Sequence, residues 1–252
     1  REAADQILNF RDSIPRDQVA GKFVFSLQQS AKHPFGLWRR TSLESYREGS
    51  PRWETRFDLD AQNAIAGRRQ QWKAGKCLPP EFTRCLIILA GPSGTGVTVR
   101  EFDTEKGEYV AGGFDIGEAA TEVEWVDSDT LLVATNWGKN SLTAAGRPRI
   151  VKIWSRGQPA REAQTVYEGD RADQEVLPKT IFSSDGKVSL FVVRQQGPQV
   201  SQLFHVDESG RAMRITVPPT AQFKGMLQRQ LLFFLTADWR TGGQNHLAGS
   251  IV

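Results

Sequence analysis

Few residues in this 252-residue sequence have the types and spacing that chemistry requires. The nucleophile of many serine hydrolases lies in a Gly-x-Ser-x-Gly turn between a strand and a helix. The nearest approach is residues 91–95, Gly-Pro-Ser-Gly-Thr, which lack the final glycine. We therefore interpret Ser93 as a turn serine and not as a nucleophile.

Residues 86–98 also resemble a phosphate-binding loop, because an apolar run leads into glycines and a threonine. Val97, however, occupies the position of the lysine that reaches the β- and γ-phosphates. Residues 97–102 favour a strand, so no helix N-terminus would follow to hold an anion. The sequence predicts a glycine-rich turn between two strands.

The remaining candidate residues, three histidines and two aspartates, are better explained by structural roles than by catalysis or metal binding. His33, His205 and His246 show no spacing to a plausible catalytic partner. Asp127 and Asp129 lack the glycine and distal glutamate of a calcium loop and are typical of a hairpin turn. The sequence therefore predicts no catalytic, cofactor-binding or metal-binding residue, and no cofactor.

Cys77 and Cys85 are separated by seven residues that include two prolines. This spacing suits neither a zinc knuckle nor a redox Cys-x-x-Cys motif. A local disulfide and two reduced thiols both remain open, and only the disulfide would imply an oxidising compartment. We expect a soluble protein, in the cytoplasm or the periplasm.

The composition argues against two kinds of binding partner, nucleic acids and membranes. Lys and Arg number 32 against 29 Asp and Glu, and the basic residues do not form the concentrated stripe of a nucleic-acid-binding surface. Apolar runs such as residues 231–235 are far too short to span a membrane. We expect neither nucleic acid nor a membrane as a partner. Because the chain begins with Arg1, we also expect that an upstream segment has been removed.

The elements that would position any site are short strands in a repeat. Residues 122–166 predict two strands around a tight polar turn at 127–129, then a long loop and two more strands. Four strands in about 45 residues is the length of a propeller blade. Asp-Gly at 185–186 gives a further strong hairpin signal.

Similar units cover the rest of the chain. Their predicted strands lie at residues 23–27, 36–41 and 53–59; at 84–90, 97–102 and 108–111; at 179–182, 188–194, 201–206 and 211–217; and at 222–227, 231–237 and 250–252. The polar residues 62–75 follow the first unit. Tryptophans fall in or beside strands and are expected in the core between sheets: Trp38, Trp53, Trp125, Trp137, Trp154 and Trp239.

The fold class expected is all-β, a β-propeller of about five four-stranded antiparallel blades. Residues 1–17 are expected to form an approach segment with helix-permitting composition, and residues 18–252 a partial propeller. The last unit stops within a blade, so we expect an incomplete ring whose unpaired edges promote self-association.

Several stretches resemble the N-terminal propeller of the prolyl oligopeptidase family of serine peptidases. The resemblance is dense over residues 14–170 and looser beyond. It is carried by residues 14–15, 33–41, 46–47, 53–54, 58–60, 77–82, 99–103, 112–114, 129–135, 137–138, 141–143, 146, 148–149, 151–152, 238–239 and 242–243. Phe35, Gln62, Ala145 and Arg147 depart from the family's pattern.

The resemblance implies a seven-bladed propeller that caps a C-terminal α/β-hydrolase domain. That domain would carry the Ser-Asp-His triad, beyond Val252, and would cleave short peptides after proline. The chain itself would be non-catalytic and would gate access of oligopeptide substrates. Its partners would be the hydrolase domain and the peptide. The alternative is a stand-alone propeller that binds a protein or peptide.

Overall fold

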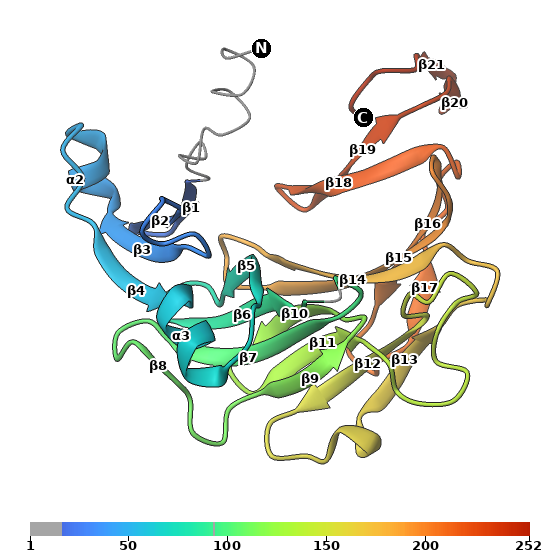
Figure 1. Ribbon diagram of the computed structural model, residues 1–252. Helices are drawn as coiled ribbons and strands as arrows, with labels where there is room; N and C mark the ends of the chain where they lie inside the picture. Colours follow the sequence, from blue (N-terminus) through green and yellow to red (C-terminus); the bar gives the residue numbers. More distant parts are fainter. Residues whose placement is uncertain (1–16, 93) are drawn as a thin grey trace, which may run out of the picture. The chain divides into compact units, whose positions relative to one another are not determined.

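The computed structural model describes residues 17–92 and 94–252 (Figure 1). The approach segment expected over residues 1–17 falls almost wholly outside this part, and so does Ser93. The described chain divides after Glu118 into two compact units, which we take separately.

The first unit contains two antiparallel sheets built from consecutive strands. One has the order β1 (Gln18–Ala20), β2 (Phe23–Gln28), β3 (Leu37–Ser42) and β4 (Glu54–Asp58). The other has the order β5 (Gln71–Cys77), β6 (Arg84–Ala90), β7 (Val97–Asp103) and β8 (Glu108–Tyr109), and β9 (Asp115–Ala119) also pairs with β7. The strands predicted at 23–27, 36–41, 84–90 and 97–102 are confirmed.

The sequence did not predict two short helices of this unit, nor the strands β1, β5 and β9. The helices are α2 (Leu43–Arg47) and α3 (Leu59–Ala66). Asp58 caps α3, because its Oδ1 accepts a hydrogen bond of 2.9 Å from the backbone N–H of Ala61. Gly67 ends it with a φ of 60°. The polar residues 62–75 therefore hold the end of a helix and most of β5.

The second unit repeats the arrangement. One sheet has the order β10 (Glu122–Asp127), β11 (Thr130–Ala134), β12 (Ile150–Ser155) and β13 (Gln164–Glu168), with the short helix η1 (Ala160–Glu162) before β13. The next has the order β14 (Glu175–Phe182), β15 (Val188–Gly197), β16 (Val200–Val206) and β17 (Ala212–Arg214).

The last part of the second unit begins another sheet. β18 (Ala221–Leu227) pairs with β19 (Gln230–Leu235), and a small hairpin follows, β20 (Trp239–Thr241) with β21 (Gln244–His246). The backbone groups of Phe233 and Val252 exchange hydrogen bonds of 2.8 and 2.9 Å. Residues 250–252 thus pair with β19, as the sequence predicts, whereas the β20–β21 hairpin was not predicted.

Within each unit, alternating side chains pack one sheet against the next. In the first unit Phe25 and Trp38 are buried and stack with ring centroids 4.7 Å apart, and they share a core with residues of β6. In the second unit the sheet β14–β17 is apolar on both faces. Val192 packs into the core shared with β10–β13, and Phe191, its neighbour in the chain, packs into the core shared with β18–β19.

Consecutive antiparallel sheets of mostly four strands, packed face to face within each unit, are the repeat of a β-propeller. The all-β prediction is confirmed. Among the described residues, no helix is long and apolar enough to cross a membrane.

The sequence left open whether the two cysteines are reduced or form a disulfide, and the structure shows the disulfide. Cys77 on β5 and Cys85 on β6 lie opposite each other and are joined by a disulfide. The bridge closes the proline-containing turn between the two strands and belongs to the core of the first unit.

Candidate functional site

The described residues of the glycine-rich stretch, 91–92 and 94–96, lie in the connection between β6 and β7. The backbone N–H of Gly91 donates to the carbonyl of Gly96 at 3.2 Å, and β7 follows directly as a strand. Without a helix after the turn, the geometry of a phosphate-binding loop is absent here. The interpretation as a turn between blade strands is confirmed.

Asp127 and Asp129 lie in the β10–β11 hairpin. The backbone N–H of Asp129 donates to Asp127 Oδ1 at 2.8 Å, and Arg156 Nε donates to Asp129 Oδ1 at 2.8 Å. Hydrogen bonds from Arg156 and Ser128 lower the pKa of Asp129 below its ordinary value. The pair stabilises a turn, as the sequence analysis predicts.

The histidines lie in different surroundings. The ring of His205 packs 5.4 Å from that of Phe191, and His246 lies 6.1 Å from Trp239. His33 instead lies beside Asp58 and Asp60, with potential ligand atoms within 4.8 Å of one another. The sequence analysis missed this grouping because about 25 residues separate the histidine from the two acids.

Tryptophans serve mainly as core and as hydrogen-bond donors. Trp38 and Trp125 are buried. The indole N–H of Trp137 donates to the carbonyl of Ile150 at 3.0 Å, and that of Trp154 donates to a loop carbonyl at 2.7 Å. These contacts agree with the structural role that the sequence predicts.

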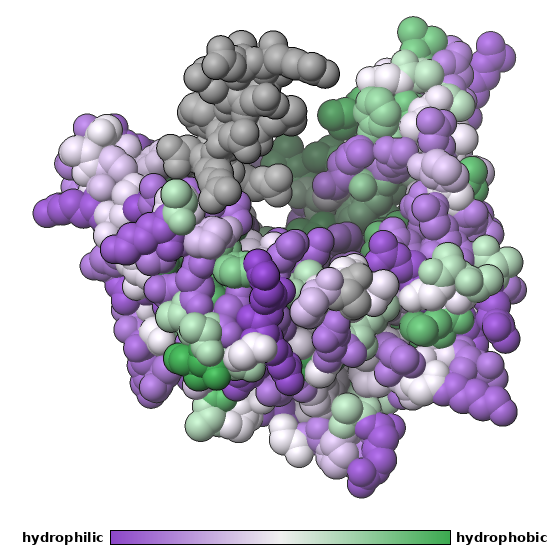
Figure 2. Space-filling view, in the orientation of Figure 1, coloured by the Kyte–Doolittle hydropathy of each residue, from purple (hydrophilic) through white to green (hydrophobic). Residues whose placement is uncertain are grey.

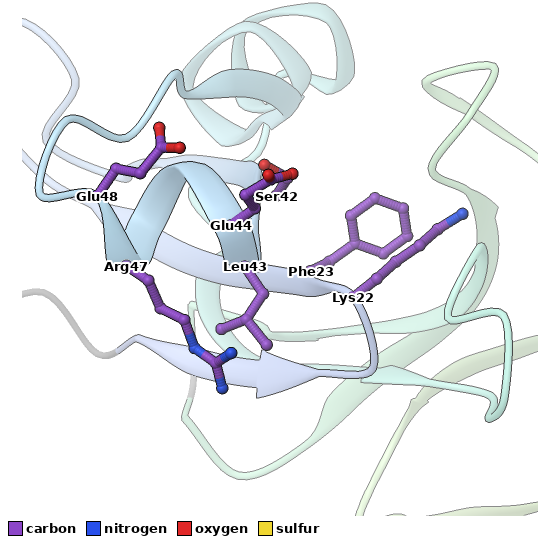
Figure 3. A pocket seen from close by; sticks show the side chains of 7 residues that line it. All are labelled: Lys22, Phe23, Ser42, Leu43, Glu44, Arg47 and Glu48. Atoms are coloured by element: carbon purple, nitrogen blue, oxygen red, sulfur yellow. The ribbon is translucent and has the colours of Figure 1, made fainter.

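One pocket, of about 680 Å³, lies over α2 and the β1–β2 turn (Figure 3). Figure 3 shows Phe23 and Leu43 in the middle of the lining, with the charged ends of Lys22, Glu44 and Arg47 around them. Charges of both signs surround a small apolar floor, which suits a contact surface better than bond-breaking chemistry.

A second pocket, of about 580 Å³, lies entirely within the second unit, where β14, β15 and β18 meet. Its lining combines two lysines, two glutamines and apolar side chains. The residues are Leu177, Lys179, Thr180, Ile181, Val193, Gln195, Pro198, Ser201, Gln222, Phe223, Lys224 and Gly225. We call it the lysine pocket.

Several polar groups in the lysine pocket have hydrogen-bonding capacity that the protein itself does not use. The hydroxyl of Thr180 is buried and has no hydrogen-bond partner. Lys179 Nζ lies 3.9 Å from Glu124, and Lys224 Nζ donates to Gln222 Oε1 at 3.2 Å. An ammonium group has three donors, so both lysines retain capacity for a ligand carboxylate or carbonyl. The lysine pocket can therefore accept a ligand that carries such an oxygen.

Neither pocket contains a nucleophile activated by a base. Within residues 17–92 and 94–252, no recorded hydrogen bond joins a serine hydroxyl or a cysteine thiol to a histidine ring. A Ser-His pair within hydrogen-bond reach is the minimum of a serine peptidase site.

Comparison with known proteins relates this fold to peptidases. Over 246 residues the chain is 32% identical to the uncharacterized peptidase y4nA of Sinorhizobium fredii, covering 94% of the chain. The solved structure of a post-proline cleaving enzyme from Rickettsia typhi matches 99% of the chain with a TM-score of 0.87 and 22% identity. The chain resembles the propeller of the prolyl oligopeptidases.

Further comparisons show how much of each related protein the chain covers. Oligopeptidase B from Leishmania major matches 92% of the propeller chain with a TM-score of 0.64 and 14% identity. The chain covers 32% of y4nA, 34% of a second curated relative from Rickettsia prowazekii, and 38% of the Rickettsia typhi enzyme. It thus spans about a third of the length of the curated relatives it matches. No family model matches the sequence.

Proposed function

We propose that this chain is the propeller domain of a prolyl oligopeptidase-like serine peptidase. In this role it gates access of short, proline-containing peptides to a catalytic α/β-hydrolase domain encoded downstream. The chain contributes binding and size selection, and the downstream domain contributes the Ser-Asp-His triad.

The observation that carries this proposal is the match to the Rickettsia typhi enzyme. Nearly the whole chain superimposes on it, while the match occupies 38% of that protein. A propeller that makes up a minor part of a post-proline cleaving enzyme leaves the larger part for the chemistry. The absence of a recorded Ser-His pair in the described residues is compatible with this division of labour.

The lysine pocket is the proposed contact for a passing peptide. β14 and β18 are the first strands of their sheets, and β10, the first strand of the preceding sheet, packs against β14. Propeller blades surround a central channel, and we assign their first strands to its wall. Lys179 and Lys224 then face the channel and favour peptides with an acidic side chain or a free C-terminal carboxylate.

The Cys77–Cys85 disulfide supports one further element of the proposal, the compartment. Disulfides persist in oxidising environments and are rare in the cytosol. Of the two compartments that the sequence leaves open, we therefore favour the periplasm.

The test begins with the source gene. The reading frame is sequenced past Val252 and its whole product is expressed and assayed. We expect a downstream Gly-x-Ser-x-Gly followed by Asp and His, and cleavage of a fluorogenic peptide after proline. We also expect activity to fall as the substrate grows from a short peptide to a folded protein. A stop codon at the end of this chain would favour the stand-alone binding propeller instead.

A further inference from the structure

Three metal-ligating residues of different elements meet at one corner of the first sheet. His33 lies in the loop between β2 and β3, Asp58 ends β4, and Asp60 lies in the first turn of α3. One potential ligand atom from each lies within 4.8 Å of the other two, and all three residues are partly buried. This group is distinct from both pockets.

Backbone hydrogen bonds hold the two carboxylates in place. Asp60 Oδ1 accepts from the N–H of Phe35 at 3.2 Å, and Asp60 Oδ2 accepts from the N–H of Gly36 at 2.9 Å. Asp58 Oδ1 accepts from the N–H of Ala61 at 2.9 Å. Such outer hydrogen bonds are the usual way in which proteins orient the carboxylate ligands of a metal.

The loop that carries the histidine is fixed as well. The backbone N–H of His33 donates to Ser30 Oγ at 3.2 Å, and the N–H of Ser30 donates to the carbonyl of His33 at 3.2 Å. The carbonyl of Gly36 accepts from the N–H of Leu59 at 3.1 Å. The imidazole is thereby held beside the β4–α3 corner.

Two observations favour a cation at this position. His33 Nδ1 is buried and has no hydrogen-bond partner, and a bound metal ion is one kind of partner that satisfies such a buried nitrogen. In the described part of the chain, neither Asp58 nor Asp60 forms an ion pair. Two neighbouring carboxylates repel each other when no positive charge lies nearby.

We propose that His33, Asp58 and Asp60 bind one divalent transition-metal ion, of which Zn²⁺ fits the donor set best. One imidazole nitrogen and two carboxylate oxygens are zinc ligands, and a three-ligand protein site leaves a fourth position for water. Ca²⁺ and Mg²⁺ prefer all-oxygen sites. Zinc bonds of about 2.0–2.2 Å require the donors to move together by about 1 Å.

The bound ion would join the β2–β3 loop to the β4–α3 corner, which stabilises the first sheet. This site is independent of the proposed peptidase role. It would also give the unpartnered His33 nitrogen and the two carboxylates a positively charged partner.

The test is isothermal titration calorimetry, in which ZnCl₂ is added to the metal-free wild type. The His33→Ala, Asp58→Asn and Asp60→Asn variants are titrated in the same way. His246→Ala, which removes a histidine stacked on Trp239, is the matched control. We expect one equivalent of Zn²⁺ to bind the wild type and the control. Each ligand variant should lose about 10- to 100-fold in affinity.

A second readout separates binding from a folding defect. Saturating Zn²⁺ should raise the Tm of the wild type by about 5 °C and leave that of His33→Ala unchanged, with matching circular dichroism for the two metal-free proteins. Co²⁺ should give a visible absorption band that His33→Ala lacks. Zinc binding of equal affinity in wild type and His33→Ala, or no binding at one equivalent, would overturn the proposal.

Discussion

The guanidinium of Arg40 on β3 lies 2.5 Å from the carboxylate of Glu105, in the turn that follows β7. The same guanidinium stacks 4.2 Å from the ring centroid of Phe23 and is nearly inaccessible to solvent. This ion pair connects the two sheets of the first unit at residues 65 apart in the chain. Its acidic partner is half-exposed, so protonation can break the contact without unfolding the sheet.

The Arg40–Glu105 pair predicts a component of acid sensitivity. The hydrogen bond from Arg40 lowers the pKa of Glu105 below its ordinary value of 4.5. A carboxyl with a lowered pKa adds stability above its unfolded pKa, and this is lost as pH falls through the folded value. Glu105→Gln should therefore lower the free energy of unfolding by about 1 kcal/mol near neutral pH.

As pH falls through the lowered pKa of folded Glu105, the wild type and Glu105→Gln should converge, because both proteins then lack the charge. Urea unfolding of the two proteins at neutral and acidic pH measures this difference. A difference that stays constant across the range would contradict the assignment.

The pair formed by Arg194 and Asp173 is the more deeply buried. Arg194 Nε donates to both oxygens of Asp173 at 2.8 and 2.9 Å, and the N–H of Asp170 also donates to Asp173. Asp173→Ala should lower the free energy of unfolding by about 2–3 kcal/mol, because charged hydrogen bonds are lost in a buried setting. Arg161→Ala, which removes an exposed pair with Glu162, should cost under about 0.5 kcal/mol. Equal effects in chemical denaturation would refute this ranking.

The disulfide should contribute measurable stability. Cys77 and Cys85 lie eight positions apart, and closing a loop of that length stabilises a fold by about 2–3 kcal/mol. Reductant should lower the urea midpoint of the wild type and leave that of a Cys77→Ser/Cys85→Ser variant unchanged. Titration of two free thiols in the folded, unreduced protein would show that the bridge does not form.

The region of β18 and β19 predicts self-association of the isolated chain. Figure 2 shows hydrophobic residues gathered over this region. Leu227, Leu247 and Ile251 are 62%, 59% and 66% exposed. Exposed apolar patches and sheet edges favour association.

The sedimentation coefficient of the chain should therefore rise with concentration, and Leu227→Lys/Leu247→Lys should suppress the rise. The control is Ile65→Lys, because Ile65 is 81% exposed on α3, in the other unit. A sharp monomer at high concentration would count against this prediction.

Strands could be predicted from the sequence where apolar and polar residues alternate and a residue typical of turns follows. Residues 84–90 form β6 within the predicted bounds, and Asp185-Gly186 forms the turn between β14 and β15. Two-residue periodicity and the conformational freedom of glycine are local properties, so a single sequence reveals them.

Elements that depend on tertiary contacts were missed. β5 contains Lys73, Gly75 and Lys76 among few apolar residues, and its pairing with the strongly apolar β6 overrides a weak local preference. The neighbourhood of His33 and Asp60 was equally hidden, because it arises from register between β3 and β4 and not from spacing.

The most direct test of the central claim is peptide hydrolysis by two proteins, the complete gene product and this 252-residue chain alone. The substrate is a short fluorogenic peptide with proline before the scissile bond. The account predicts turnover by the complete product, abolished when its downstream Gly-x-Ser-x-Gly serine is replaced by alanine, and no turnover by the chain alone. Hydrolysis by the isolated chain, or a complete product without a hydrolase domain, would contradict it.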